Sequence, residues 1–180
     1  KHPHSYSLGI QNIYDQDEGA FTGEISAAQV KDLVQYALVG HSERRHIFGE
    51  KDAEIARKVA AALRHDITPI LCVGETLLER ESGHSKQVVV DQLTTGLGYI
   101  TSEELANVVI AYEPVWAIGT GNFARPDDVI EMIAVIRNHL EELYSETAGG
   151  SVRVLYGGSA EPENTRSYMK IAGCDGLLVG

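Results

Sequence analysis

The stretch Val108-Val-Ile-Ala-Tyr-Glu-Pro-Val-Trp-Ala-Ile-Gly-Thr-Gly121 joins an apolar run to a carboxylate and a glycine-containing segment. Its residues 108–111 predict a buried strand, and Pro114 stops that strand from continuing its ladder of hydrogen bonds. Glu113 therefore stands at a strand end, which is a rigid place to hold a base. The single Trp of the chain, Trp116, follows in a segment that suits a loop folding over a site and offering N–H groups to an anion. A surface Glu followed by a tight turn is the alternative interpretation.

Working outward from this stretch, the chain alternates short apolar runs with helical patterns. Such alternation predicts an α/β fold in which the strands pair in parallel through right-handed crossovers. The other predicted strands cover residues 6–14, 36–40, 68–73, 152–156 and 176–179. Helices are predicted from Ser26 to about Val34, from Asp52 to Arg64, around Val88 to Leu93, from Pro126 onward and from Pro162 onward.

Unusual residues follow nearly every predicted strand, namely His41, Glu75, Glu113, the run Gly157-Gly-Ser159 and Gly180. An open parallel sheet gathers its site at one crevice, whereas a closed barrel draws site residues from many strand ends. The pattern therefore favours a barrel over an open sheet.

Composition sets further bounds. A chain of 180 residues allows one domain, here residues 1–180, and its net charge of -11 argues against nucleic acid or an anionic membrane as a partner. No apolar run approaches the ~18 residues of a membrane span. Cys72 and Cys174 lack metal-ligand spacing, and free thiols in a reducing cytosol are favoured over a disulfide. We also expect surface positions and no metal ligand among the remaining histidines, which are His2, His4, His46, His65, His84 and His139.

The pattern Gly119-Thr-Gly121-Asn-Phe-Ala124 matches the dinucleotide fingerprint GxGxxG/A in its residue types but not in its structural context. The glycines do not directly follow the strand, and the acidic residue expected about 20 positions later would fall inside a helix. We therefore do not favour a dinucleotide site.

His41 has two interpretations, because it follows Gly40 at a strand end. It either caps the next segment or forms an acid and base pair with Glu113. The adjacent Glu43, Arg44 and Arg45 are either surface ion pairs or a support for the site.

Backbone amides at the last strand ends supply a candidate anion site. The two final loops of a barrel commonly bind phosphate through N–H groups. An acidic chain can hold a phosphate in this way, here through Gly119, Ser159 and Gly180.

Six motifs run across the whole length of the chain. They are Leu8-Gly-Ile-Gln-Asn12, Gly19-Ala-Phe-Thr-Gly-Glu24, Gly40-His-Ser-Glu-Arg-Arg45, Pro69-Ile-Leu-Cys-Val-Gly-Glu75, Ala111-Tyr-Glu-Pro-Val-Trp-Ala-Ile-Gly-Thr-Gly121 and Tyr156-Gly-Gly-Ser159. Together these motifs resemble the triosephosphate isomerase family.

The resemblance implies a (β/α)8 TIM barrel that interconverts dihydroxyacetone phosphate and D-glyceraldehyde 3-phosphate in glycolysis and gluconeogenesis, without cofactor or metal. Glu113 matches the family's base, and His41 matches a neutral electrophile that stabilises the enediolate. Residues 115–121 match a closing lid, and Ser42 and Glu43 match supporting positions. The resemblance also implies a cytoplasmic homodimer in which Phe21-Thr22-Gly23 docks into the neighbouring subunit.

The chain departs from the family pattern at its start, because nothing in it matches the family's N-x-K motif with its electrophilic Lys. By resemblance it carries about strands 3 to 8 and lacks the last helix, so we expect it to be part of a longer chain. The alternative is a catalytically incomplete fragment that acts at most as a subunit-binding or structural piece. A different phosphate-binding barrel would need a base other than Glu113. At the lid's second hinge, Asn122-Phe-Ala-Arg125 replaces the usual Lys and small hydroxyl residue.

Overall fold

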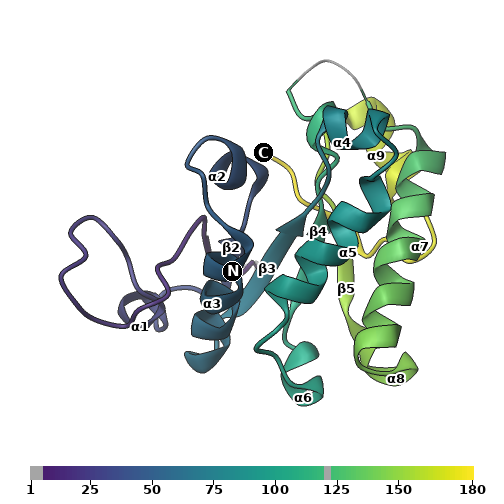
Figure 1. The fold of residues 1–180 in the computed structure, drawn as a ribbon. Coiled ribbons are helices and arrows are strands. Elements are labelled where there is room, and N and C mark those ends of the chain that lie inside the picture. Colours follow the sequence, from purple (N-terminus) through teal and green to yellow (C-terminus); the bar gives the residue numbers. More distant parts are fainter. Residues whose placement is uncertain (1–5, 120–122) are drawn as a thin grey trace, which may run out of the picture.

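The computed structural model describes residues 6–119 and 123–180, and in this part of the chain six parallel strands form one sheet (Figure 1). The order of the strands in the sheet is the order in the chain. The strands are β1 (Gly9–Ile10), β2 (Tyr36–Val39), β3 (Thr68–Val73), β4 (Val109–Tyr112), β5 (Arg153–Tyr156) and β6 (Gly176–Leu177).

Each strand pairs in parallel with the next one along the chain. Leu71 of β3 is in register with Ile110 of β4, and Tyr112 of β4 with Tyr156 of β5. Parallel pairing brings all carboxyl ends to the same edge of the sheet. The predicted α/β fold with parallel strands is confirmed, and the arrangement fits consecutive units of a TIM barrel.

Three long helices, α3, α5 and α7, stand side by side on one face of the sheet (Figure 1). α7 begins where the sequence predicts, with Pro126 at its first turn and Asp127 and Asp128 at the positive end of its dipole. Within the described residues the helices are α1 (Ala27–Val30), α2 (Ser42–His46), α3 (Asp52–Arg64), α4 (Leu77–Glu81), α5 (Ser85–Gly96), α6 (Ser102–Leu105), the 3-10 turn η1 (Val115–Ala117), α7 (Pro126–Leu143), α8 (Glu146–Ser151) and α9 (Pro162–Tyr168).

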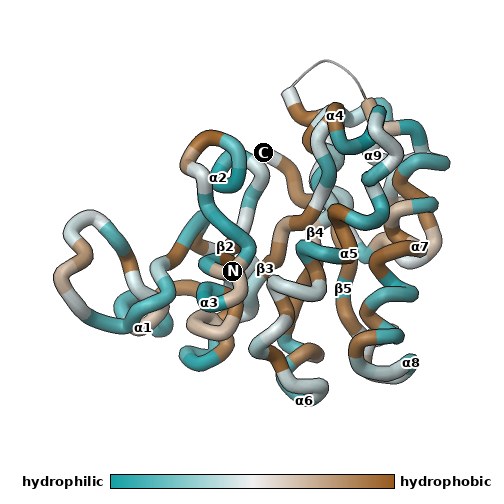
Figure 2. The backbone as a smooth tube through the Cα atoms, viewed as in Figure 1, coloured by the Kyte–Doolittle hydropathy of each residue, from teal (hydrophilic) through white to brown (hydrophobic). Residues whose placement is uncertain are grey.

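The core lies between the strands and these helices, where Figure 2 shows hydrophobic stretches of the backbone on both layers. Strand residues such as Leu71 and Ile110 are fully buried against helix residues such as Leu93 and Ile136. A second, smaller cluster joins Ile13 to Ala37 and Ile67 under α3. Burial on this scale fixes the strand ends that carry the candidate site.

The strand predicted over residues 6–14 is far shorter in the structure. Only Gly9 and Ile10 pair with β2, because the chain then turns away so that Ile13 enters the smaller cluster. Tyr14 forms an isolated bridge with Ser26. The alternating polarity of residues 6–14 therefore comes from individual side chains, such as Ile10 and Ile13, that pack on the core, and not from a continuous strand.

The helix predicted from Ser26 to Val34 also ends early. Ser26 forms the predicted capping box with Gln29, but α1 stops at Val30 and the chain turns. α2, α8 and η1 were not predicted, since each is six residues or shorter and carries no apolar stripe long enough to recognise.

Both cysteines are free thiols, as predicted, and burial raises the pKa of Cys72 well above its ordinary value. Throughout residues 6–119 and 123–180, no helix is both long and apolar enough to cross a membrane. His2 and His4, predicted to be surface residues, lie outside the described residues.

Candidate active site

His41 and Glu113 meet at the carboxyl ends of β2 and β4. His41 Nε2 lies 2.9 Å from Glu113 Oε1, and Glu113 is only 2% exposed. The backbone N–H of Ser42 donates to the other carboxylate oxygen, Oε2, at 2.9 Å. The carboxylate is therefore held at one oxygen by a backbone amide and faces an imidazole with the other.

The position of His41 follows from a sharp turn after β2. Gly40 has a φ of +72°, a conformation that favours glycine, and His41 is the N-cap of α2. Its Nδ1 accepts a hydrogen bond from the N–H of Glu43 at 3.3 Å. An accepting Nδ1 carries no proton, so the proton of a neutral ring is on Nε2, toward Glu113. Contact with Glu113 raises the pKa of His41, against the lowering effect of burial.

A cavity of about 310 Å³ opens in front of this pair. Gly119, Ser159 and Gly180 line it together with His41 and Glu113, so the structure brings these five sequence-predicted residues to one place. Glu43 also lines the cavity, but its side chain is 67% exposed. Gly157 of the predicted Gly157-Gly-Ser159 run and Ile118 of the predicted lid also line the cavity. The lining residues that the sequence did not indicate are Gln11, Leu38, Leu178 and Val179.

The loop after β5 is tied to the segment that follows Glu113. Ser159 Oγ donates to the carbonyl oxygen of Ala117 at 2.5 Å. Gly157 packs so closely that an added Cβ would lie 3.1 Å from Glu113 Cγ. Thr120 and Gly121 of the predicted lid, and Asn122 of its hinge, lie outside the described residues.

Backbone hydrogen bonds continue past the strands and fix the residues on both sides of Glu113. The N–H of Glu113 donates to Val73 O at 2.8 Å, and that of Val115 donates to Glu75 O at 3.1 Å. On the other side, the N–H of Gly157 donates to Tyr112 O at 2.7 Å. Glu113 is thus held between β3 and the segment that follows β5.

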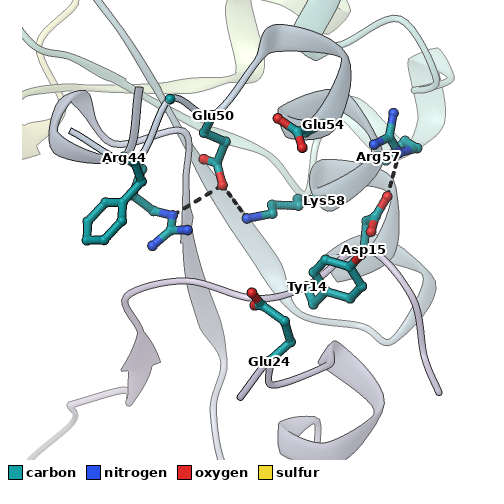
Figure 3. Close-up of a pocket in the computed structure, with 10 residues that line it drawn as sticks. Tyr14, Asp15, Glu24, Arg44, Glu50, Glu54, Arg57 and Lys58 are labelled. Carbon is teal, nitrogen blue, oxygen red and sulfur yellow. Dashed lines mark hydrogen bonds and ion pairs between the residues drawn. The ribbon is translucent and has the colours of Figure 1, made fainter. Parts of the chain in front are cut away.

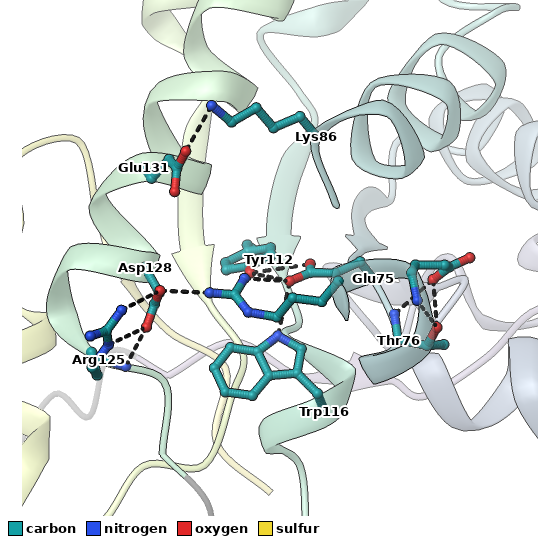
Figure 4. A network of polar contacts seen from close by, with 10 residues as sticks. Glu75, Thr76, Lys86, Tyr112, Trp116, Arg125, Asp128 and Glu131 are labelled. Atoms are coloured by element: carbon teal, nitrogen blue, oxygen red, sulfur yellow. Dashed lines mark hydrogen bonds and ion pairs between the residues drawn. The ribbon is translucent and has the colours of Figure 1, made fainter. Parts of the chain in front are cut away.

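Glu75 is a fully buried carboxylate that anchors the start of the loop (Figure 4). It accepts hydrogen bonds from Trp116 Nε1 at 2.9 Å, from Tyr112 OH at 3.2 Å and from Arg80 at 3.1 Å. Burial raises the pKa of Glu75, and these donors oppose that effect. The interaction holds η1 against the end of β3.

The same network reaches the start of α7. Arg80 Nη2 pairs with Asp128 Oδ1 at 2.6 Å, and its guanidinium lies 4.5 Å from the centre of the Trp116 ring. Asp128 also pairs with Arg125 at 3.0 Å, a contact that lowers the pKa of Asp128 (Figure 4). Charged groups therefore connect Trp116, near the start of the predicted lid, to the first turn of α7.

Arg45 supports the site in a way that its sequence context left open. Its side chain is 8% exposed, and it donates to Gly40 O at 2.7 Å and to Cys72 O at 3.0 Å. It therefore bridges the ends of β2 and β3. Arg44 instead pairs with Glu50 at 3.2 Å. A run of Glu-Arg-Arg gives no signal of which arginine points inward.

The predicted docking segment Phe21-Thr22-Gly23 lies in an exposed loop. Phe21 is 41% exposed, and its ring centre is 4.6 Å from that of Tyr14. The stem of this loop meets α3, where Asp15 pairs with Arg57 beside the pair of Lys58 and Glu50 (Figure 3). Within the described residues, no group of three or more His, Cys, Asp and Glu side chains is placed to hold a metal ion.

Comparison with known proteins gives one consistent result. The family model described as triosephosphate isomerase matches residues 1–180. The chain is 49% identical over 175 residues to triosephosphate isomerase from Moorella thermoacetica, covering 97% of this chain and 70% of that protein. It is also 49% identical to the proteins of that name from Roseiflexus sp. strain RS-1 and Chlamydia muridarum, covering 97% and 96% of this chain and 69% and 64% of theirs.

Proposed function

The chain belongs to the triosephosphate isomerase family, and we propose that its cavity at the strand ends interconverts dihydroxyacetone phosphate and D-glyceraldehyde 3-phosphate through an enediolate. The observation that carries the proposal is the 2.9 Å approach of His41 Nε2 to Glu113 Oε1 at the wall of the cavity. A base and an electrophile must both reach one small substrate, and these two side chains are close enough to do so.

Glu113 acts as the base in this proposal. Ser42 holds Oε2, while the buried Oε1 faces His41 Nε2 at 2.9 Å on the wall of the cavity. An oxygen with a free lone pair is available to take a proton from the carbon next to the substrate carbonyl. The same oxygen returns that proton to the neighbouring carbon. His41 Nε2 gives its proton to the carbonyl oxygen and takes one from the hydroxyl oxygen, so the oxygen proton also moves and the isomerisation balances.

His41 acts as the electrophile. With Nδ1 occupied by the N–H of Glu43, the ring donates from Nε2 to the carbonyl oxygen of the substrate. A proton next to a carbonyl is weakly acidic, so its removal requires stabilisation of the oxyanion as it forms. A hydrogen bond from a neutral imidazole supplies that stabilisation.

The phosphate is bound by backbone N–H groups of Gly119, Ser159 and Gly180, which share the cavity with the base. Local dipoles are needed because the net charge of -11 gives no general attraction for an anion. Closure of residues 115–121 excludes water, since an exposed enediol phosphate would lose its phosphate.

The wider assignment follows the family. We propose a single domain over residues 1–180 that acts in glycolysis and gluconeogenesis in the cytoplasm, as part of a homodimer in which the Phe21-Thr22-Gly23 loop meets the partner. The exposed ring of Phe21 supports this contact. The alternative is a catalytically incomplete fragment that acts at most as a subunit-binding or structural piece.

An isomerase assay with glyceraldehyde 3-phosphate tests the proposal on the chain itself, on Glu113→Asp and on the control Glu18→Asp. Glu18 carries the same carboxylate in an exposed loop and does not line the cavity. We expect activity in the unmodified chain and in Glu18→Asp, and a large loss in Glu113→Asp. Equal activity in all three proteins would overturn the role of Glu113, and activity in none would favour the subunit-binding alternative.

A further inference from the structure

Gln92 of α5 binds both backbone polar groups of one residue, Gly74, at the end of β3. The N–H of Gly74 donates to Gln92 Oε1 at 2.7 Å, and Gln92 Nε2 donates to Gly74 O at 3.2 Å. The neighbouring carbonyls of Val73 and Glu75 instead accept from residues that follow β4. Val73 and Glu75 thus bond to the chain around Glu113, and Gly74 between them bonds to the side chain of Gln92 on α5.

Gly74 is in direct contact with the backbone of Glu113. A Cβ added to Gly74 would lie 1.7 Å from Glu113 O, which leaves no room between the two chain segments. The bonds from Glu113 N to Val73 O and from Val115 N to Glu75 O lie on either side of this contact. Because the contact is tight, a shift of Gly74 shifts Glu113 as well.

We propose that Gln92 is a positioning residue for Glu113, whose side-chain amide holds the Gly74 peptide against the base and so keeps the carboxylate within reach of His41. The catalytic consequence of this inference rests on the proposed function; the structural consequence, the approach of Glu113 to His41, does not. Among uncharged side chains of this length, only that of Gln offers a planar donor and acceptor together.

The first experiment measures the pKa of His41 by NMR titration of its ring protons. Contact with Glu113 raises this pKa, so the value reports how close the two side chains are. We expect Gln92→Leu, which removes both hydrogen bonds, to move the pKa of His41 down toward its ordinary value of about 6.5. Glu113→Gln removes the charge of the partner entirely, so it gives the largest decrease in the pKa of His41 against which the Gln92 variants are compared.

The matched control is Gln87→Leu on the same helix. Gln87 is exposed, and within the described residues its amide bonds to Asp91 alone, at 2.8 Å, so this change should leave the pKa of His41 unaltered.

Gln92→Glu is the second variant, because it keeps the acceptor for Gly74 N–H and loses the donor to Gly74 O. It should lower the pKa of His41 less than Gln92→Leu does, and it decides the question if Gln92→Leu does not fold. Folded Gln92 variants in which His41 titrates as in the unmodified chain would overturn the inference.

The second experiment separates positioning from substrate binding. If Gln92 acts through Glu113, kcat for the isomerisation falls on the order of 10–100-fold in Gln92→Leu while KM changes little, because small misplacements of a catalytic group act on the chemical step. Loss of activity in the unmodified chain would count against the proposed function alone, since the titration of His41 still tests the positioning. A change in KM without a change in kcat would overturn the inference.

Discussion

The strand ends around Glu113 and the loop before Ser26 are held in place in opposite ways. At the strand ends, glycines pack tightly against their neighbours: a Cβ on Gly74 would lie 1.7 Å from the backbone oxygen of Glu113, and a Cβ on Gly158 would lie 2.2 Å from the Tyr156 hydroxyl. The loop is held instead by ion pairs, of which the one between Arg64 and Asp17, at 2.9 Å, is about half exposed.

This difference indicates where the chain tolerates amino-acid substitutions. Close packing is sensitive to single added atoms, because neighbouring groups have no space into which to move. Exposed ion pairs contribute little, because water and salt screen them and long side chains lose entropy when fixed. We therefore expect large effects at the strand ends and small effects in the loop, in the order given below.

The largest expected effect comes from the same carboxyl-to-amide change made in both regions. Glu113→Gln removes the proposed base and should lower kcat by about 10²–10⁴-fold. Glu18→Gln, in the exposed loop, should leave kcat unchanged. Steady-state assays in both directions of the isomerisation measure the two values, and comparable losses in both variants would break the comparison.

Gly→Ala changes give the next effect, measured as the free energy of unfolding in urea. Gly74→Ala should lower it by about 3 kcal/mol, because the backbone must separate from Glu113 to admit the methyl group. In the loop, Gly23→Ala meets open space and is disfavoured only by a φ of +97°, so we expect a loss of about 1 kcal/mol.

Gly150→Ala is the control for these two changes, since it meets open space in α8 and has no left-handed φ. It should raise the free energy of unfolding by about 0.5–1 kcal/mol. A smaller loss for Gly74→Ala than for Gly23→Ala would contradict the account of close packing.

Asp66 tests whether backbone strain is confined to the site. It is the sole non-glycine residue with a left-handed backbone within the described residues, with a φ of 57°. It lies just before the amino end of β3, away from the carboxyl ends of the strands, where the candidate site lies. Asp66→Gly should raise the free energy of unfolding by about 0.5–1 kcal/mol and leave kcat unchanged. A fall in stability would mean that the Asp side chain contributes more than its strained backbone costs.

Asp17 gives the smallest effect and a defined dependence on pH. The hydrogen bond from Arg64 lowers the pKa of Asp17, so the folded state favours the ionised carboxylate. Its contribution is present above about pH 4, the ordinary value for Asp, and is lost as the pH falls through the lowered pKa. Asp17→Asn should therefore reduce the free energy of unfolding at pH 7 by no more than about 0.5 kcal/mol.

The check is a series of urea titrations from pH 7 to pH 3 on both proteins. The difference between the unmodified chain and Asp17→Asn should shrink toward zero as the pH falls. A difference that grows on acidification would show that another group accounts for it.

Most of the fold could be predicted from the sequence, because its strands are apolar runs with clear ends. Residues 68–73 are predicted and observed as β3, and the strand ends mark the positions of His41 and Glu113. The prediction of a strand over residues 6–14 was wrong, because alternating polarity does not show whether a partner strand is present along the whole length.

The supporting residues of the site could not be predicted. Gln92 looks like any polar residue of an amphipathic helix, and its partner Gly74 lies 18 residues away on another element. Arg45 is one of two adjacent arginines, and only the packing of α2 turns it inward. The proximity of His41 to Glu113 could be anticipated because both stand at strand ends, whereas side chains that reach the site from helices carry no such marker.

The arrangement of the strands in chain order bears on how the molecule forms during synthesis. Each strand pairs with the one made just before it, so every new strand finds its partner already exposed at the growing edge. Such stepwise addition needs no long-range search through the unfinished chain, and the His41 end of the sheet can be in place before Glu113 leaves the ribosome. Stalling translation between β3 and β4 should therefore leave a nascent chain whose β2 and β3 are already protected from protease.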